Sequence, residues 1–64
     1  MTPDKIRTLR AALEENTKTF GARFMVSGRT VEDWEQGRHG PHRLVVVALE
    51  TLAREVKDAR KAAQ

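Results

Sequence analysis

Residues 17–38, TKTFGARFMVSGRTVEDWEQGR, decide the fold of this chain. Cap-type residues open this stretch, so a short helix of about two turns is expected to begin near residue 17 and to end at residue 24 or 25. Ser27 is a further cap candidate and predicts a second helix over residues 28–35. Two glycines and a proline within residues 36–41 are strong stop signals and predict the end of that helix.

Two short helices joined through residues 25–27, with a small residue inside the first, are typical of a helix-turn-helix. Gly21 is expected to be small because the second helix crosses close to the first at that point. Ser27 is expected to cap the second helix and to leave its N-terminus exposed, where it can enter a major groove. The apolar contacts between the helices are predicted to come from Phe20, Phe24, Val26, Val31 and Trp34.

The flanking segments predict one helix on each side of this pair. Thr2 as cap and apolar residues at helical spacing indicate an amphipathic helix over residues 3–15. The last helix is expected over residues 42–62, and its tail, residues 57–64, is expected to fray. Leu44 and Ala48 lie beside an apolar seam that is predicted to serve as a dimer interface and consists of Val45, Leu49, Leu52 and Val56.

Composition limits what the chain can be. The 64 residues carry 12 Lys and Arg against 9 Asp and Glu, a net charge of +3, and no cysteine. One small domain over residues 1–64 is expected, without disulfides, thiolate nucleophiles or the usual zinc sites, and without room for a deep substrate cavity. No apolar run approaches the roughly 18 residues of a membrane span, and the N-terminus lacks signal-peptide features, so a cytoplasmic protein is expected. The positive charge points weakly to a polyanionic partner.

Beyond these patterns, the chain from Ile6 to Leu52 resembles the lambda-repressor-like helix-turn-helix proteins, the Cro and repressor type often called XRE. The resemblance implies a compact all-α domain of four to five helices that binds double-stranded DNA. It is carried by the motif Thr17-x-x-Phe20-Gly21-x-x-Phe24-x-Val26-Ser27-x-x-Thr30-Val31-x-x-Trp34-Glu35-x-Gly37-Arg38-x-x-Pro41.

The resemblance also implies roles for individual residues. Base edges would be read by Gly28, Arg29, Glu32 and Asp33, with Arg29 suited to a bidentate pair with guanine and the acids to a cytosine amino group. An internal salt bridge would join Arg10 and Glu35. The positions that hold phosphate in the family fall on Asn16, Thr17, Lys18, Gln36, Arg38 and Arg43.

The chain departs from the family at three of these positions. Met25 stands where glycine is usual, at a turn position that often needs a positive φ, so a strained or differently shaped turn is expected. Thr17 replaces a common glutamine and shortens the reach to DNA. Gly28 offers no side chain at a reading position, so specificity is expected to rely partly on DNA shape.

Several residues have two interpretations. Trp34 is expected in the core, with base stacking as the alternative. His39 and His42 are three residues apart but lack a third ligand nearby, so phosphate contact or simple exposure is favoured over a metal site. Ser27 is explained better as a cap than as a nucleophile. The basic residues of the tail form a solvated face or touch DNA or a partner: Lys57, Arg60 and Lys61.

Together these observations favour a homodimeric transcriptional regulator, most simply a repressor or autorepressor of a bacterial, phage or mobile-element operon, bound to a palindromic operator. A module that uses the same scaffold to bind a partner protein, as an antitoxin or antirepressor would, is the alternative. An enzyme is not expected, because no convincing acid-base pair is present. Neither a cofactor, a metal, a membrane nor a small-molecule ligand is expected.

Overall fold

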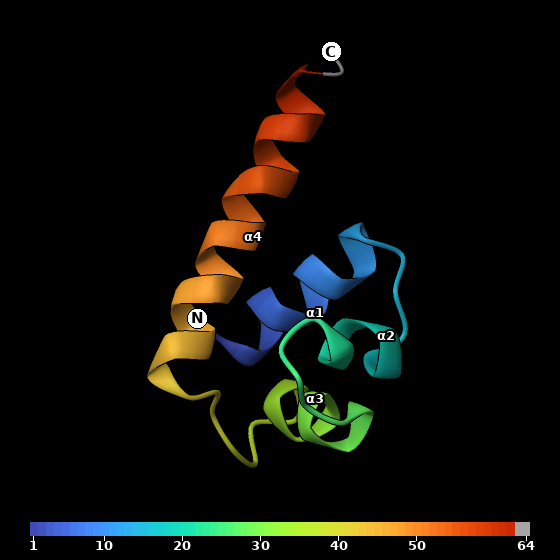
Figure 1. Cartoon of the computed structure of the whole chain (residues 1–64), viewed down its shortest axis with the longest axis vertical. Coiled ribbons are helices and arrows are strands. Elements are labelled where there is room, and N and C mark those ends of the chain that lie inside the picture. Colours follow the sequence, from blue (N-terminus) through green and yellow to red (C-terminus); the bar gives the residue numbers. More distant parts are fainter. Residues whose placement is uncertain (63–64) are drawn as a thin grey trace.

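The computed structural model describes residues 1–62 and contains helices without strands in that range. In chain order the helices are α1 (Pro3–Ala12), α2 (Thr17–Ala22), α3 (Gly28–Glu35) and α4 (Arg43–Ala62). Figure 1 shows α1, α2 and α3 gathered in a compact group with α4 running along one side. The prediction of an all-α chain is confirmed, with four helices in the described range. The predicted fraying at residues 63 and 64 lies outside the described residues.

Side chains just outside the first three helices cap their N-termini. The oxygens of Thr2, Asn16 and Ser27 accept hydrogen bonds from the backbone N–H groups three residues further on, at 3.2, 2.7 and 3.2 Å. Each bond satisfies one of the N–H groups that the first turn of a helix leaves without a partner. The predicted caps at Thr2 and Ser27 are therefore confirmed, and Asn16 is the N-cap of α2.

Each of these three helices ends in the same type of backbone turn. Glu14, Met25 and Gly37 adopt φ values of 56°, 58° and 76°, the left-handed region. After each helix, this residue and the next donate N–H bonds to carbonyls three and five residues earlier, as in Val26 to Gly21 at 3.0 Å and Arg38 to Asp33 at 2.9 Å. This pattern is the Schellman motif, in which glycine usually occupies the left-handed position.

The Schellman turns correct two predicted helix ends. The first helix ends at Ala12 rather than at residue 15, and the second ends at Ala22 rather than at residue 24 or 25. The sequence does not indicate these two turns, because neither glutamate nor methionine is a residue type that predicts a positive φ. The positive φ expected at Met25 is present, and its side chain is 94% exposed.

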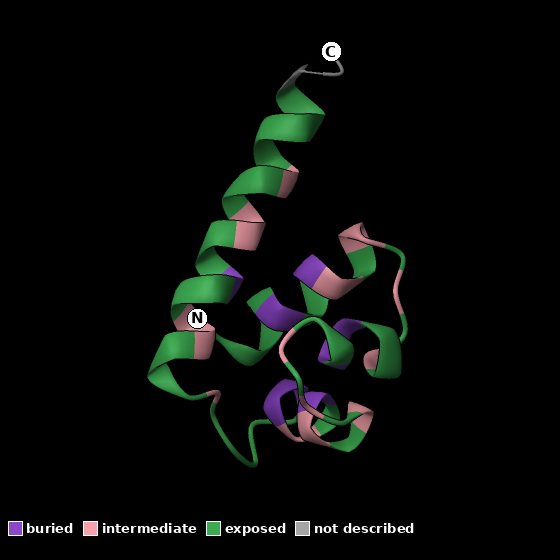
Figure 2. Cartoon of the chain, in the orientation of Figure 1, coloured by how far each residue is buried: buried purple, intermediate pink, exposed green. Residues whose placement is uncertain are grey.

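The core lies where the four helices meet. Figure 2 shows the buried faces of α1, α2 and α3 turned toward one another. Phe24 packs edge-on between Phe20 and Trp34, with ring centroids 5.3 and 6.4 Å apart, which confirms Trp34 as a core residue. The buried apolar residues are Ile6, Leu9, Phe20, Val31, Trp34 and Leu49.

α4 is the longest helix and begins at Arg43, slightly later than predicted. The Nδ1 atom of His42 accepts a hydrogen bond from the Leu44 N–H at 3.1 Å. The molecule measures 36 × 22 × 20 Å, and Figure 1 shows the C-terminal end of α4 extending beyond the other helices along the longest direction. None of the helices within residues 1–62 combines the length and the apolar character needed to cross a bilayer.

The predicted dimer seam faces the core of its own subunit. Leu49 is fully buried, and Val45, Leu52 and Val56 are half-buried against the core. The prediction is therefore wrong for Leu49, which has no surface left for a second subunit. The large apolar side chains that α4 leaves exposed are Leu44 and Val47, at 73% and 57%.

Candidate functional site

α3 has one face in the core and one face in solvent. Val31, Trp34 and Glu35 are buried, whereas Glu32 and Gln36 are exposed and the Arg29 side chain is 77% exposed. A helix held by one face in this way presents the side chains of the other face on a rigid support. Of the residues predicted to read bases, Arg29 and Glu32 lie on this outer surface.

Asp33 brings two exposed arginines together at the same surface. Its Oδ1 atom lies 3.8 Å from Nε of Arg29, one turn earlier in α3, and 3.6 Å from Nη1 of Arg38 in the following loop. The Asp33 side chain is only 20% exposed, against 77% and 59% for the arginines. The carboxylate predicted to read a base thus lies close to two cations, at distances slightly too long for a hydrogen bond to either. The left-handed turn at Gly37 causes this, because it folds Arg38 back over Asp33.

Gly28, predicted as a reading position, has a packing role that the sequence did not indicate. A Cβ atom at this position would lie 3.1 Å from both the backbone N of Lys18 and Oγ1 of Thr17. The start of α3 therefore rests against the start of α2, and Thr17 is half-buried there while Lys18 is exposed. This contact joins the two helix starts into one surface.

The other predicted phosphate contacts are exposed but less connected. Asn16 uses its side-chain oxygen to cap α2. Gln36 and Arg38 follow directly on α3, at the end where Asp33 lies. Arg43 opens α4, beyond the loop, and forms no hydrogen bond or ion pair with the rest of this set in the described part of the chain.

The predicted pair between Arg10 and Glu35 is present and ties α1 to α3. Arg10 Nε and Nη2 donate to the two carboxylate oxygens of Glu35 at 2.6 and 3.0 Å, and Arg10 Nη1 donates to the carbonyl of Glu15 at 3.0 Å. The hydrogen bond to Glu35 raises the pKa of Arg10 above its ordinary value, against the opposing effect of desolvation. This geometry supports the structural role that the resemblance implied.

Two further arginines, which the sequence analysis does not single out for this role, also link separate segments of the fold. Arg7 Nη2 donates to the carbonyl of Glu35 at 2.7 Å, so it strengthens the link from α1 to the end of α3. Arg23 donates to both carboxylate oxygens of Glu15 at 2.8 and 2.7 Å. These bonds lower the pKa of Glu15 and raise that of Arg23. Arg7 shares a helix face with Arg10, a signal that was available; no local spacing indicates the pair of Arg23 with Glu15.

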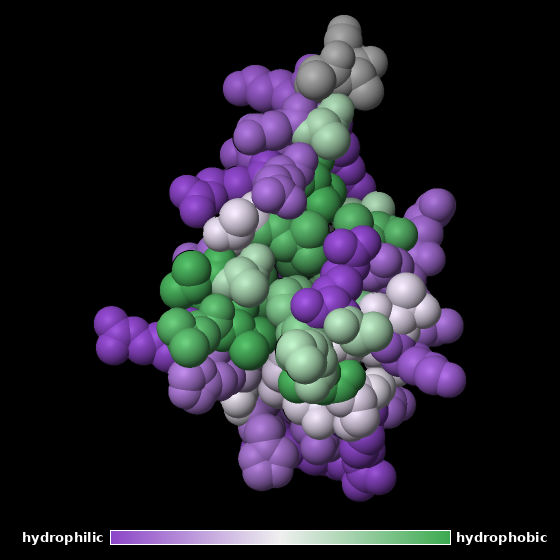
Figure 3. Space-filling model, in the orientation of Figure 1, coloured by the Kyte–Doolittle hydropathy of each residue, from purple (hydrophilic) through white to green (hydrophobic). Residues whose placement is uncertain are grey.

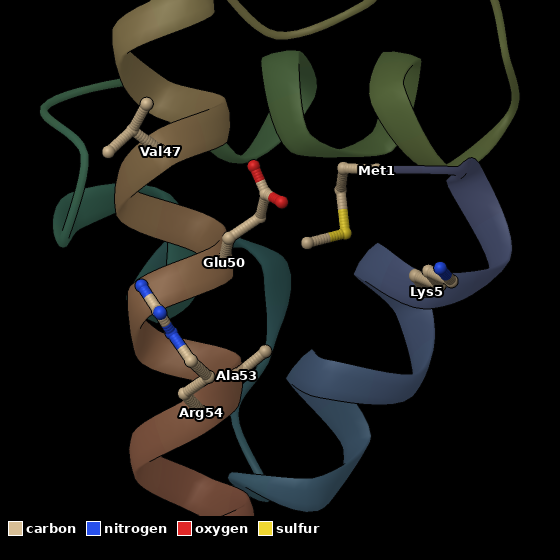
Figure 4. A pocket seen from close by; sticks show the side chains of 6 residues that line it. All are labelled: Met1, Lys5, Val47, Glu50, Ala53 and Arg54. Atoms are coloured by element: carbon tan, nitrogen blue, oxygen red, sulfur yellow. The ribbon is translucent and has the colours of Figure 1, made fainter.

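A second surface feature lies between α1 and α4. It is a pocket of about 400 Å³ lined by Met1, Lys5, Val47, Glu50, Ala53 and Arg54. Figure 4 shows Met1 pointing toward α4, with Lys5 on α1 and the other four residues on α4. A neighbouring groove of about 280 Å³ is apolar at its floor and is lined by Met1, Lys5, Thr8, Leu9, Ala12, Ala53, Val56, Lys57 and Arg60. Figure 3 shows hydrophobic side chains over the N-terminal half of α4, close to these depressions.

Histidine and carboxylate side chains do not gather into a metal site in the described part of the chain. Within residues 1–62, three or more such groups never come close enough together to hold an ion. His39 and His42 are both exposed in the loop that leads to α4.

Comparison of the chain with protein-family models, with curated proteins and with solved structures gives no match in any of the three. The geometry of the chain's own residues is therefore the basis for the proposal that follows.

Proposed function

We propose that this chain is a sequence-specific double-stranded DNA-binding regulator of transcription with a lambda-repressor-like helix-turn-helix, in which α2 and α3 form the motif. α3 would enter the major groove, with Arg29 on a guanine edge. Lys18, Gln36 and Arg38 would contact phosphates beside the groove and hold the helix in position. The regulator would act as a repressor by covering a promoter.

One observation carries this proposal: the outer face of α3 is polar and exposed while its inner face is locked in the core. Arg29 projects from that face, Lys18 flanks its start and Arg38 flanks its end. DNA-binding proteins place cations in this way on both sides of the helix that enters the groove. The cations neutralise the phosphate backbone while the helix reads the bases. The Schellman turns and the Arg10–Glu35 pair hold the direction of α3.

The proposal includes a homodimer on a palindromic operator. Leu44 and Val47 leave apolar surface on α4 that a monomer does not cover. Two-fold symmetry would place two copies of α3 in successive major grooves, about 34 Å apart. Each subunit would then read one half-site.

The test is fluorescence-anisotropy titration of a random-sequence 20-base-pair duplex at several salt concentrations. We expect affinity to fall steeply with salt, with a logarithmic slope of about 0.9 per phosphate neutralised. Replacing Arg29 and Arg38 together by alanine should reduce both affinity and slope. Replacing Lys5 and Arg54 together by alanine removes the same charge from the exposed surfaces of α1 and α4 and serves as the matched control. Absence of duplex binding even at low salt would exclude this function.

A partner-protein module is the second candidate, and the surface between α1 and α4 favours it. The groove there combines an apolar floor with cationic Lys5, Lys57 and Arg60. An interaction module would show no salt-dependent duplex binding, and alanine at Arg29 and Arg38 would leave its partner binding unchanged. The titration therefore discriminates between the two candidates.

A further inference from the structure

We propose that Asp33 is a positioning residue that couples Arg29 to Arg38 and thereby sets how strongly the protein distinguishes its target DNA from other DNA. This inference rests on the proposed function, since it assigns a role within the same surface. It replaces the expectation that Asp33 itself reads a base.

The geometry of the cluster supports a positioning role. Both ion pairs converge on the same carboxylate oxygen, Oδ1 of Asp33, at 3.8 Å from Arg29 and 3.6 Å from Arg38. Asp33 has a short side chain that is mostly covered, whereas both arginines are long, exposed side chains. The less mobile carboxylate therefore defines a common point toward which the two guanidinium groups are drawn. Because that point is shared, a change in one ion pair alters the other.

The ion pairs leave the arginine donors available. Both distances exceed the hydrogen-bond range, and neither guanidinium donates a hydrogen bond within the described residues. Attraction at such distances between exposed groups is weak and is readily exchanged for a better acceptor. The arrangement thus orients Arg29 and Arg38 before binding without occupying the N–H groups that would contact guanine and phosphate.

The charge of Asp33 gives this arrangement a consequence for selectivity. A carboxylate between the arginines opposes the approach of phosphates, so it weakens binding to every duplex. On the target duplex, Arg29 is already oriented for a bidentate contact with guanine, and this contact offsets the loss of affinity. On other sequences Arg29 makes no such contact, so the loss remains. Asp33 should therefore lower affinity for arbitrary DNA more than affinity for the target.

Glu55 provides a control outside the proposed DNA-binding surface. It is exposed on α4, carries the same charge and forms no ion pair with Arg29 or Arg38 in residues 1–62. Glu55→Gln thus removes one negative charge from the chain while leaving the cluster intact. Asp33→Asn removes the same charge and also breaks the coupling.

The experiment begins with selection of bound duplexes from a random 20-base-pair pool by the wild-type chain. The most enriched duplex and a scrambled duplex of equal composition then serve as the two probes. Dissociation constants for both probes give a discrimination ratio. We expect Asp33→Asn to bind the scrambled duplex more tightly and to lower the ratio by roughly fivefold or more, the scale of one bidentate base contact. We expect Glu55→Gln to change the affinity for both duplexes by the same factor and to leave the ratio unchanged.

A second set of variants tests the coupling itself. Arg38→Ala should change the ratio in the wild-type background but not in the Asp33→Asn background, because the coupling requires the carboxylate. Arg43→Ala, which removes an arginine outside the cluster, should weaken both probes alike. Helical circular dichroism and melting temperature identify any variant that has lost its fold.

The outcomes separate the two proposals. If the wild-type chain enriches no duplex, the proposed function fails and this inference fails with it. If it enriches a motif but Asp33→Asn keeps the same ratio as Glu55→Gln, only the role of Asp33 is overturned. An Arg38→Ala effect on the ratio that persists without Asp33 would likewise contradict the coupling.

Discussion

Arg10 and Glu35, 25 positions apart in the chain, meet through two parallel hydrogen bonds of 2.6 and 3.0 Å that join α1 to the last turn of α3. Glu35 is buried, so its charge depends on this partner for stabilisation, with Arg7 adding a weaker contact at 3.9 Å. The third bond of Arg10, to the carbonyl of Glu15, extends the same guanidinium to the loop before α2. One side chain thus connects three segments of the fold.

Removal of either member of this pair is expected to destabilise the chain. Glu35→Ala and Arg10→Ala should each lower the free energy of unfolding by about 2 kcal/mol, because a part-buried charged group loses its hydrogen-bond partner. The double variant should lose less than the sum of the two single losses. Urea unfolding followed by circular dichroism measures all three values, and strictly additive losses would show that the pair contributes no coupling energy.

Gly21→Ala tests the close approach of the chain to α2. A Cβ atom at Gly21 would lie 2.7 Å from the carbonyl oxygen of Val26 and 3.0 Å from that of Ser27, both rigid backbone atoms. We expect a loss of about 1–3 kcal/mol of stability, measured by thermal unfolding. Gly40→Ala is the control, since a Cβ atom there meets nothing within 4 Å. Equal melting temperatures for the two variants would contradict the packing at Gly21.

Met25→Gly should stabilise the protein. Met25 holds a left-handed backbone conformation with its side chain almost fully exposed, so glycine relieves strain without removing a buried contact. The expected gain is about 1 kcal/mol, seen as a higher midpoint in urea. Met25→Ala retains the strain and removes the same side chain, and it should leave the midpoint close to that of the wild type.

The pair of Glu15 with Arg23 predicts a specific dependence of stability on acid. The folded chain holds the pKa of Glu15 below its ordinary value, so the carboxylate binds a proton less readily when folded than when unfolded. Its contribution is fully present above the ordinary glutamate pKa of about 4.3 and is lost as the pH falls through the lower folded-state value.

Urea unfolding at a series of pH values compares the wild type with Glu15→Gln. The wild type should be more stable near neutral pH by about 1 kcal/mol or less, as is usual for exposed pairs, and the two should converge in acid. Glu55→Gln removes an exposed carboxylate of α4 and is the control. A difference between wild type and Glu15→Gln that grew as the pH fell would have the wrong sign.

The proposed homodimer should depend on Leu44 and Val47. Sedimentation velocity of the wild type is expected to show a dimer at micromolar concentration, and serine at both positions should give a monomer. Because both side chains are exposed, the double variant should keep its helical circular dichroism. Met25→Ser removes a comparable exposed apolar side chain outside α4 and should remain dimeric. A monomeric wild type at concentrations that saturate DNA would contradict the dimer.

Helix starts and the core were predictable because their signals are local. Thr2 and Ser27 are residue types that cap helices, and the spacing of Val31 and Trp34 indicates one buried face. Gly37 marks the end of α3 for the same reason. The ends of α1 and α2 were placed too late, since Glu14 and Met25 adopt a conformation that only the surrounding hydrogen bonds impose.

The candidate site was predictable only in part. Periodicity shows that Val45, Leu49, Leu52 and Val56 share a face, but not whether the same chain or another covers it, and burial of Leu49 assigns that residue to the subunit core. The position of Asp33 between Arg29 and Arg38 depends on the turn at Gly37, which brings together residues on either side of a helix end. Helical spacing alone connects Asp33 with Arg29 and gives no indication of Arg38.

The three Schellman turns separate the scaffold of this protein from its outer surface. Main-chain hydrogen bonds close the ends of α1, α2 and α3, and the side chains on the exposed face of α3 take no part in those bonds. Arg29, Glu32 and Gln36 can therefore be exchanged as a set while the helices keep their directions. Under the proposed function, a few surface substitutions would give such a chain a new DNA target without first requiring a new fold.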